Sequence, residues 1–208
     1  FEGLAIEKME TEWKKYPVLH LDLNAKKYET PADLIAMLNQ TLEKWEIVYG
    51  NEKKDRSPEE RFAYVIERAY EQAGCGVVVL VDEYDKPLLQ ALDNDALLED
   101  YRKTLKAFYG VLKSADRYLR FAFLTGVTKF SQVSVFSDLN QLNDISLDYS
   151  YATVCGITRT ELVETFTPEI EEFSRVNKLS AEETVDKMAR QYDGYHFHPK
   201  GEGVFNPF

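Results

Sequence analysis

Two adjacent acids, Asp82 and Glu83, directly follow the uninterrupted aliphatic run at 77–81. Such a run predicts a strand buried on both faces, and a buried strand holds the side chains at its end in fixed places. One carboxylate can then bind a divalent cation through oxygen, and its neighbour can polarise a water molecule. An alternative stays open, in which Asp82 caps a following helix and Glu83 lies in solvent.

A second strong strand candidate, 118–126, ends in polar and small residues that suit phosphate chemistry. Thr125 can sense a phosphate or position a water, Gly126 lets backbone approach a phosphate, and Lys129 can lie on the phosphate side. The alternative is a strand that simply ends in a turn. Together with the first strand end, this segment is typical of the Walker B and sensor parts of P-loop ATPases.

Two other groupings match chemical patterns but have simpler interpretations. His196 and His198 are spaced like an H-x-H metal pair on one strand face. Metal sites usually need four ligands and the chain has 3 histidines, so an aromatic turn packed against the core is the competing interpretation. Glu12 and Lys14 match half of a nuclease E-x-K pattern, but salt bridges on an amphipathic N-terminal helix explain them better.

The order of elements that must position these residues indicates the fold class. Strands are predicted at 16–24, 77–81, 118–126 and 151–158, and helices at 30–50, 57–74, 93–117, 159–177 and 180–191. Strands separated by helical segments indicate an α/β protein with a mostly parallel sheet flanked by helices. Ligands bind such sheets at the carboxyl ends of the strands, where Asp82, Glu83 and Thr125 fall.

Charge and composition argue against several classes of partner. The net charge of −11, with no dense block of Lys and Arg, argues against nucleic acid as a partner of this segment alone. No apolar run approaches the roughly 18 residues that span a bilayer, so no membrane partner is expected. The 2 cysteines and the absence of a signal-peptide pattern predict a cytoplasmic location. The oligomeric state stays open.

Several short segments occur in one order along the chain, namely VVVLVDEYDKPLL, TGVTKFS, CGITRTEL, YDGYHF and VFNP. With them the chain resembles, over essentially its whole length, the predicted AAA-ATPase-like proteins. The resemblance implies ATP and Mg²⁺ as ligands, with Asp82 on the Mg²⁺ side, Glu83 as catalytic base and Thr125 as sensor. It also implies a helical lid and a C-terminal PD-(D/E)XK nuclease-like domain in the same polypeptide.

The chain departs from that family in one motif. A Walker A loop needs G-x-x-x-x-G-K-[ST], and no pair of the 10 glycines satisfies this spacing. In the family the loop and its strand precede the segment that starts at Phe1, so we expect this chain to be the middle of a longer protein. The missing strand would lie between the strand that ends at Thr125 and the one at 151–158, which leaves two apolar edges unpaired.

The predicted organisation is a P-loop NTPase-like core over 1–158, without its Walker A strand and loop, followed by a helical lid and an aromatic tail over 159–208. Arg159 is a further candidate for the phosphate side. We expect the Walker B and sensor part of an ATP-binding and hydrolysing module, inactive by itself because the main triphosphate cradle is absent. The alternative is a non-enzymatic α/β interaction module whose acidic strand end binds a protein partner.

Overall fold

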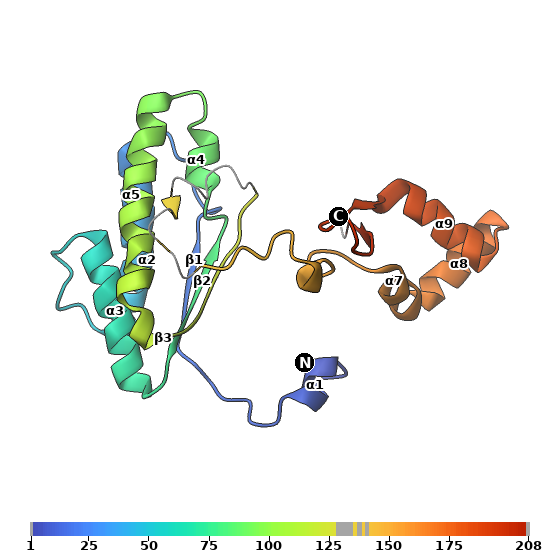
Figure 1. Ribbon diagram of the computed structural model, residues 1–208, viewed down its shortest axis with the longest axis horizontal. Coiled ribbons are helices and arrows are strands. Elements are labelled where there is room, and N and C mark those ends of the chain that lie inside the picture. Colours follow the sequence, from blue (N-terminus) through green and yellow to red (C-terminus); the bar gives the residue numbers. More distant parts are fainter. Residues whose placement is uncertain (1, 128–134, 137–138, 140–141, 207–208) are drawn as a thin grey trace. The chain divides into compact units, whose positions relative to one another are not determined.

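The computed structural model describes residues 2–127, 135–136, 139 and 142–206 (Figure 1). The chain forms two compact units, unit 1 (Phe1–Gln141) and unit 2 (Leu142–Phe208), and each is described by itself. The described elements of unit 1 are α1 (Ala5–Met9), β1 (Val18–Asp22), α2 (Pro31–Tyr49), α3 (Pro58–Ala73), β2 (Val77–Asp82), α4 (Lys86–Gln90), α5 (Asp95–Ser114), a 3₁₀ turn (Asp116–Tyr118) and β3 (Leu119–Leu124). Those of unit 2 are a 3₁₀ turn (Tyr149–Tyr151), α7 (Arg159–Thr165), α8 (Thr167–Asn177), α9 (Ala181–Tyr192), β4 (Asp193–Tyr195) and β5 (Val204–Phe205).

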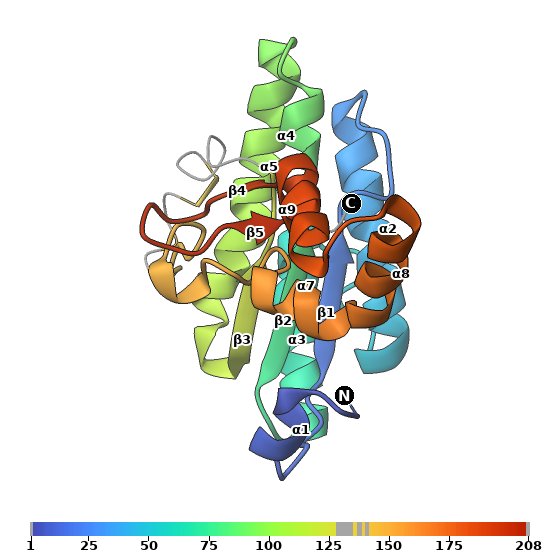
Figure 2. The ribbon, with the colours of Figure 1, turned by 90° about the vertical axis from the view of Figure 1, so that its right-hand side faces the viewer.

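Unit 1 contains a parallel sheet of 3 strands in the order β1-β2-β3 (Figure 2). The register pairs Asp22 of β1 with Asp82 of β2, and Leu80 of β2 with Phe123 of β3. Paired residues of a sheet share a face, so the register decides which side chains meet on each side. The predicted α/β class, with a parallel sheet flanked by helices, is confirmed.

The helices α2, α3 and α5 all lie on one face of this sheet (Figure 1). The chain adds β2 and then β3 on the same side of β1, and right-handed connections between parallel strands then place both crossovers on one face. Burying one aliphatic side chain there stabilises the fold by about 1.5–3 kcal/mol. The strand residues under the helices are almost fully buried, and they are Leu19, Leu21, Val77, Val79 and Val81.

The opposite face of the sheet, here called the open face, carries no helix of unit 1 among the described residues (Figure 1). Val18 is 50% exposed, Phe121 53% and Phe123 36%, while Val78 and Leu80 are half-buried. The prediction that the run 77–81 is buried on both faces is therefore wrong for one face. β3 ends the strand order, so within the described part of the chain its outer edge has no strand partner.

The ends of α2 and α3 follow the signals read in the sequence. Thr30 and Ser57 each form a capping box with the acid three residues on, and a proline follows each cap. Such boxes satisfy two of the unpaired amides at a helix start. Gly74 ends α3 in the left-handed region at φ 63°, where glycine has no Cβ penalty. The two predicted helices are confirmed.

A buried ion pair joins α2 to α3 behind the sheet. The Arg61 guanidinium donates to both carboxylate oxygens of Glu46, each at 2.7 Å, and a third donation reaches Asn39. Both charged side chains are almost fully buried, at 6% and 4% exposure. Removing one partner of such a pair leaves the other charge buried and unpaired, which lowers the free energy of unfolding by about 3–5 kcal/mol.

Unit 2 is a small helical unit with a short antiparallel pair of strands, β4 and β5. The helices predicted at 159–177 and 180–191 are confirmed, the first as the two helices α7 and α8. The Ser174 and Thr184 hydroxyls share a hydrogen bond of 2.7 Å between α8 and α9, beside the buried side chains of Ile170 and Val185.

Two predicted elements are wrong. Residues 152–156 form turns and a bend after the 3₁₀ turn Tyr149–Tyr151, and only the isolated bridge between Ile157 and Phe205 pairs the predicted segment 151–158 with a strand. A strand needs a partner along its length, and β5 offers one for a single residue. The N-terminal amphipathic helix is short, since α1 ends at Met9, and Trp13 follows at φ 46°. Glu12 and Lys14 therefore lie outside any helix.

None of the helices in the described part of the chain combines the length and the apolarity that a bilayer span requires.

Candidate functional site

Three polar residues lie at the carboxyl edge of the sheet in unit 1. Asp22 and Asp82 are register partners at the ends of β1 and β2. Thr125 follows Leu124, which pairs with Val81, so Thr125 flanks Asp82 from the β3 side. By the alternation of strand side chains, Asp22, Asp82 and Thr125 lie at the edge of the open face.

The tips of β2 and β3 are joined by a side-chain hydrogen bond. The Thr125 hydroxyl donates to Asp82 Oδ1 at 2.5 Å. Backbone bonds continue the ladder past the strand ends, because the Thr125 amide donates to the Val81 carbonyl at 2.8 Å and the Tyr84 amide to the Thr125 carbonyl at 2.9 Å. The structure thus brings together Asp82 and Thr125, the residues that the sequence predicted for the Mg²⁺ side and for the sensor.

Glu83 occupies an uncommon backbone conformation beside this pair. Its φ is 54°, in the left-handed region that a non-glycine residue enters at a cost of about 1–3 kcal/mol. Its amide donates to Asp82 Oδ1 at 3.1 Å, and its half-buried side chain forms no hydrogen bond or ion pair with a described residue. A strained residue that keeps a carboxylate available is a feature of functional sites.

Asp82 does not cap the helix that follows it. α4 begins at Lys86, with Asp85 in the N-cap place, and Asp82 Oδ1 instead accepts from the Glu83 amide and from Thr125. The capping alternative for Asp82 is therefore wrong. Its exposed carboxylate and the neighbouring hydroxyl are oxygen ligands of the kind that Mg²⁺ prefers.

A buried tyrosine lies behind the tip of β1. The Tyr28 hydroxyl donates to the Leu23 carbonyl at 2.7 Å, and its ring is 2% exposed. Burial raises the pKa of Tyr28 well above its usual value, and the negative charge of Asp22 raises the same pKa further. Tyr28 therefore stays neutral and donates its hydrogen bond to the backbone just after β1.

Two further predicted residues do not join this cluster. Lys129 lies outside the described residues. Arg159 stands at the start of α7 in unit 2, where it donates to Asp186 Oδ1 at 2.6 Å and both side chains are about half exposed. Its observed partner is thus a carboxylate of its own unit.

The two histidines of the H-x-H pattern do not share a strand face. β4 ends at Tyr195, so His196 and His198 lie in the turn after it. His198 Nδ1 accepts a hydrogen bond from the Lys200 amide at 3.1 Å. The His198 and Tyr149 rings pack edge to face, with centroids 5.5 Å apart. Among the described residues, no group of three or more His, Cys, Asp and Glu side chains could hold a metal ion.

The aromatic residues around these histidines are more exposed than predicted. Tyr192 is 51% exposed and Tyr195 50%, so the prediction that they pack against the core is wrong. Tyr195 instead stacks on Phe197, with ring centroids 6.2 Å apart.

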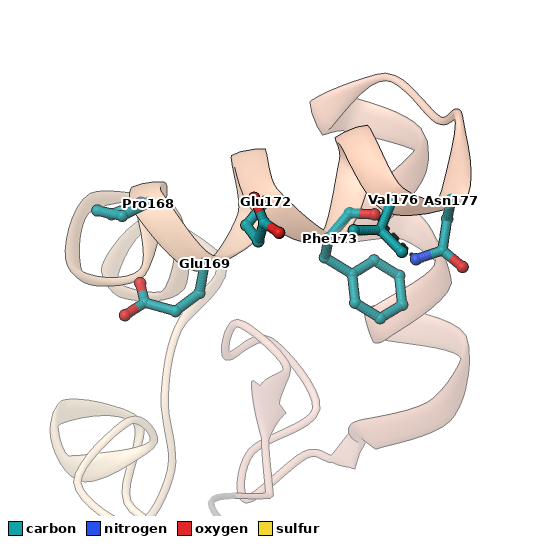
Figure 3. A pocket seen from close by; sticks show the side chains of 6 residues that line it. All are labelled: Pro168, Glu169, Glu172, Phe173, Val176 and Asn177. Atoms are coloured by element: carbon teal, nitrogen blue, oxygen red, sulfur yellow. Dashed lines mark hydrogen bonds between the residues drawn. The ribbon is translucent and has the colours of Figure 1, made fainter.

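A shallow groove of about 520 Å³ runs along α8 (Figure 3). Its lining pairs apolar side chains, such as Phe173 and Val176, with the carboxylates of Glu169 and Glu172. Two carboxylates repel an anionic triphosphate, so the groove does not suit a nucleotide. The geometry that suits one is at the strand tips of unit 1.

Sequence reasoning missed two acids of the site. Asp22, the register partner of Asp82, was not among the predicted site residues. The signal was present, because HLDLN places an acid at a strand end in the same way as VVVLVDE. Asp85 was given no role, although its side chain is 0% exposed, because no local sequence pattern predicts a buried carboxylate.

Comparisons with known proteins identify the family of this chain. The family described as "Predicted AAA-ATPase" matches residues 1–136 of the chain. An "Uncharacterized protein in vnfD 5'region" of Azotobacter chroococcum mcd 1 is 36% identical over 208 residues, 100% of this chain, and the chain spans 38% of the length of that relative. No solved structure matches the chain significantly. Because the family match covers more than half of its length, this chain belongs to the predicted AAA-ATPase-like family.

Proposed function

We propose that this chain forms the Walker B and sensor part of an ATP-binding and hydrolysing module and is inactive by itself. The observation that carries the proposal is the hydrogen bond between Asp82 at the end of β2 and Thr125 at the end of β3. Membership of the AAA-ATPase-like family supports ATP and Mg²⁺ as ligands in general.

The donor set at this edge of the sheet fits a hard divalent cation. Asp82 holds the Mg²⁺ side of the site, directly or through water, and Thr125 positions the γ-phosphate or the attacking water. Glu83 accepts a proton from that water as general base. When bound, Mg²⁺ supplies positive charge that stabilises the charge spread over the transferred phosphoryl group.

The phosphate cradle in this proposal comes from outside residues 1–208. A strand and loop elsewhere in a longer polypeptide would supply the backbone amides, and the unpaired edge of β3 and the open face support this source. Lys129 is assigned to the phosphate side. Residues 1–158 form the ATPase-like core, and residues 159–208 form a lid and tail. The lid closes in response to the bound nucleotide. A nuclease-like domain in the same polypeptide rests on the resemblance alone, and a cytoplasmic location rests on composition.

The test uses the whole encoded polypeptide. The wild type should hydrolyse ATP only with Mg²⁺, and Glu83→Gln should lower kcat about 10²–10⁴-fold, the usual contribution of a general base. Binding should survive, so Mg-ATP at 100 times Kd should still stabilise this variant by about 2.7 kcal/mol in thermal unfolding. Glu43→Gln, an exposed acid on α2, is the matched control and should hydrolyse like the wild type.

Three results would contradict parts of the proposal. Equal turnover in wild type and Glu83→Gln would remove Glu83 as the base. Unchanged Mg²⁺ dependence in Asp82→Asn would remove Asp82 from the metal side. A whole polypeptide that neither binds nor hydrolyses ATP would end the nucleotide assignment.

One observation favours a second candidate, a non-enzymatic α/β interaction module. The open face presents Val18, Phe121 and Phe123, each at least 36% exposed, as an apolar surface that a protein partner could cover. The two candidates differ in the nucleotide titration, because the module predicts no stabilisation by Mg-ATP.

A further inference from the structure

We propose that Asp85 is a positioning residue of this site, because its fully buried carboxylate holds the loop after β3 against the loop after β2 and so sets the places of Thr125 and Glu83. The inference rests on the proposed function and extends it to a residue that does not itself face the open edge.

The burial of Asp85 needs an explanation. Its side chain is 0% exposed, and buried carboxylates are rare unless hydrogen bonds or cations offset their desolvation. Asp85 stands in the N-cap place of α4, yet its side chain forms no capping hydrogen bond there. Its Oδ1 instead accepts from the backbone amide of Val127, at 3.2 Å, across a sequence separation of 42 residues.

The two loops lie in close contact at this point. A Cβ added to Gly126 would come within 2.4 Å of the Tyr84 ring and 2.6 Å of Asp85 Oδ1, closer than real Cβ atoms approach. Gly126 therefore lets the backbone after β3 pass directly over Tyr84 and Asp85. The glycine was predicted to admit a phosphate, and in this structure it admits the neighbouring loop.

Successive bonds join the same two loops. The Asp82 carboxylate accepts from the Thr125 hydroxyl, the Tyr84 amide donates to the Thr125 carbonyl, and the Asp85 carboxylate accepts from Val127. Glu83 lies between the first two contacts, so its left-handed conformation is fixed from both sides. Removing the bond between Asp85 and the Val127 amide loosens the contact between the two loops at Val127.

The aromatic residues near Asp85 pack on one another. Tyr84 is 3% exposed, and its ring centroid lies 4.9 Å from that of Phe136. The Phe136 ring also packs on Tyr109, whose side chain is fully buried. Burial raises the pKa of Tyr109, and the charge of Asp85 is among the smaller causes, which places the two groups near each other. Aromatic packing therefore holds the segment that carries Asp85, and its carboxylate can position the loop after β3.

The experiment compares two changes that break the same bond from opposite sides, in the whole encoded polypeptide. Asp85→Ala removes the acceptor, and Val127→Pro removes the amide donor, since proline has no N–H. Each should lower kcat for Mg-ATP about 100-fold, the loss expected when a catalytic group moves by about 1 Å. KM should change by less than about threefold, because the lost geometry matters in the transition state.

The control variants separate positioning from stability. Asp85→Asn keeps an Oδ1 acceptor and should recover about tenfold of the lost rate. Val127→Ala controls for the side chain of Val127, which is 70% exposed. Glu46→Gln disturbs another buried carboxylate, in the ion pair with Arg61, and should lower the melting temperature while leaving kcat of the folded protein unchanged.

The outcomes are distinct. The double variant Asp85→Ala/Val127→Pro should lose less rate than the product of the two single losses, because both changes remove the bond between Asp85 and the Val127 amide. If both single variants lower the melting temperature but keep wild-type kcat, Asp85 is structural and the inference is overturned while the proposed function stands. If Asp85→Ala does not fold, the Val127→Pro and Val127→Ala pair decides. If the wild type neither binds nor hydrolyses ATP, the proposed function and this inference fail together.

Discussion

The two faces of the sheet in unit 1 are built from the same three strands but are buried to different extents. Leu21 on the helix-covered face is 1% exposed, whereas Val18 on the open face of the same strand is 50% exposed. The open face also leads to the edge where Asp82 meets Thr125. The face that carries no helix among the described residues of unit 1 is therefore the one that carries the candidate chemistry.

This difference has a topological cause. All the described crossovers of unit 1 run in one direction across the sheet, so right-handed connections place their helices on one side. Parallel sheets are normally covered on both faces. The covered face stabilises the unit, and the open face is left for another segment or partner.

The largest effect should separate the two faces by stability. Leu21→Ala should lower the free energy of unfolding by about 2–5 kcal/mol, because it removes packed methyl groups beneath the helices. Val18→Ala, on the open face of the same strand, should change it by less than about 0.5 kcal/mol. Urea denaturation of both variants measures the difference. Similar losses in the two variants would mean that the open face is covered in solution.

A smaller effect concerns pH and the buried tyrosine near the tip of β1, Tyr28. Burial raises the pKa of Tyr28, so the folded state keeps this proton at a pH where the unfolded state, with a pKa of about 10, has lost it. Stability is thus fully present below about pH 10 and falls as pH rises above it, by up to about 1.4 kcal/mol per pH unit for this group.

The measurement is the free energy of unfolding between about pH 8 and about pH 11, where Tyr28→Phe should show a shallower decline than the wild type. A Tyr28→Phe curve parallel to the wild type would show that the tyrosine is not buried in solution.

The smallest effect should come from the aromatic pair on the open face. Phe121 and Phe123 stack with centroids 6.0 Å apart while both remain exposed. Phe121→Ser in residues 1–208 should change the free energy of unfolding by less than about 0.5 kcal/mol. In the whole polypeptide the cost should rise to about 3–5 kcal/mol if a further segment buries the ring, as the proposed function requires. A negligible cost there as well would favour a face that stays open.

Local signals in the sequence predicted most of unit 1. Capping boxes at Thr30 and Ser57 and the terminator Gly74 act within one helical turn, so they can be read without the fold. The aliphatic run before Asp82 likewise identified β2 and the carboxylates at its end. The general rule for parallel sheets placed Asp82 and Thr125 at the same edge of the sheet, without predicting that they are in contact.

Predictions that needed a distant partner were the ones that were wrong. The apolar residues at 151–158 suited a strand, but pairing was available only where Ile157 meets Phe205. The burial of 77–81 on both faces depended on elements that the described part of unit 1 does not place over the open face. Pairing and coverage are properties of several segments together, which no local pattern encodes.

The amino-acid sequence by itself determined the helices of unit 1, its three parallel strands and the identity of the acids at their ends, because propensity, capping and alternation act over a few residues. Only the tertiary structure decided that Asp82 meets Thr125, that Glu83 adopts a left-handed backbone, and that Asp85 is buried against the amide of Val127. Those features arise where segments about 40 residues apart are held in contact by strand register and side-chain packing, and that contact is fixed only in the folded chain.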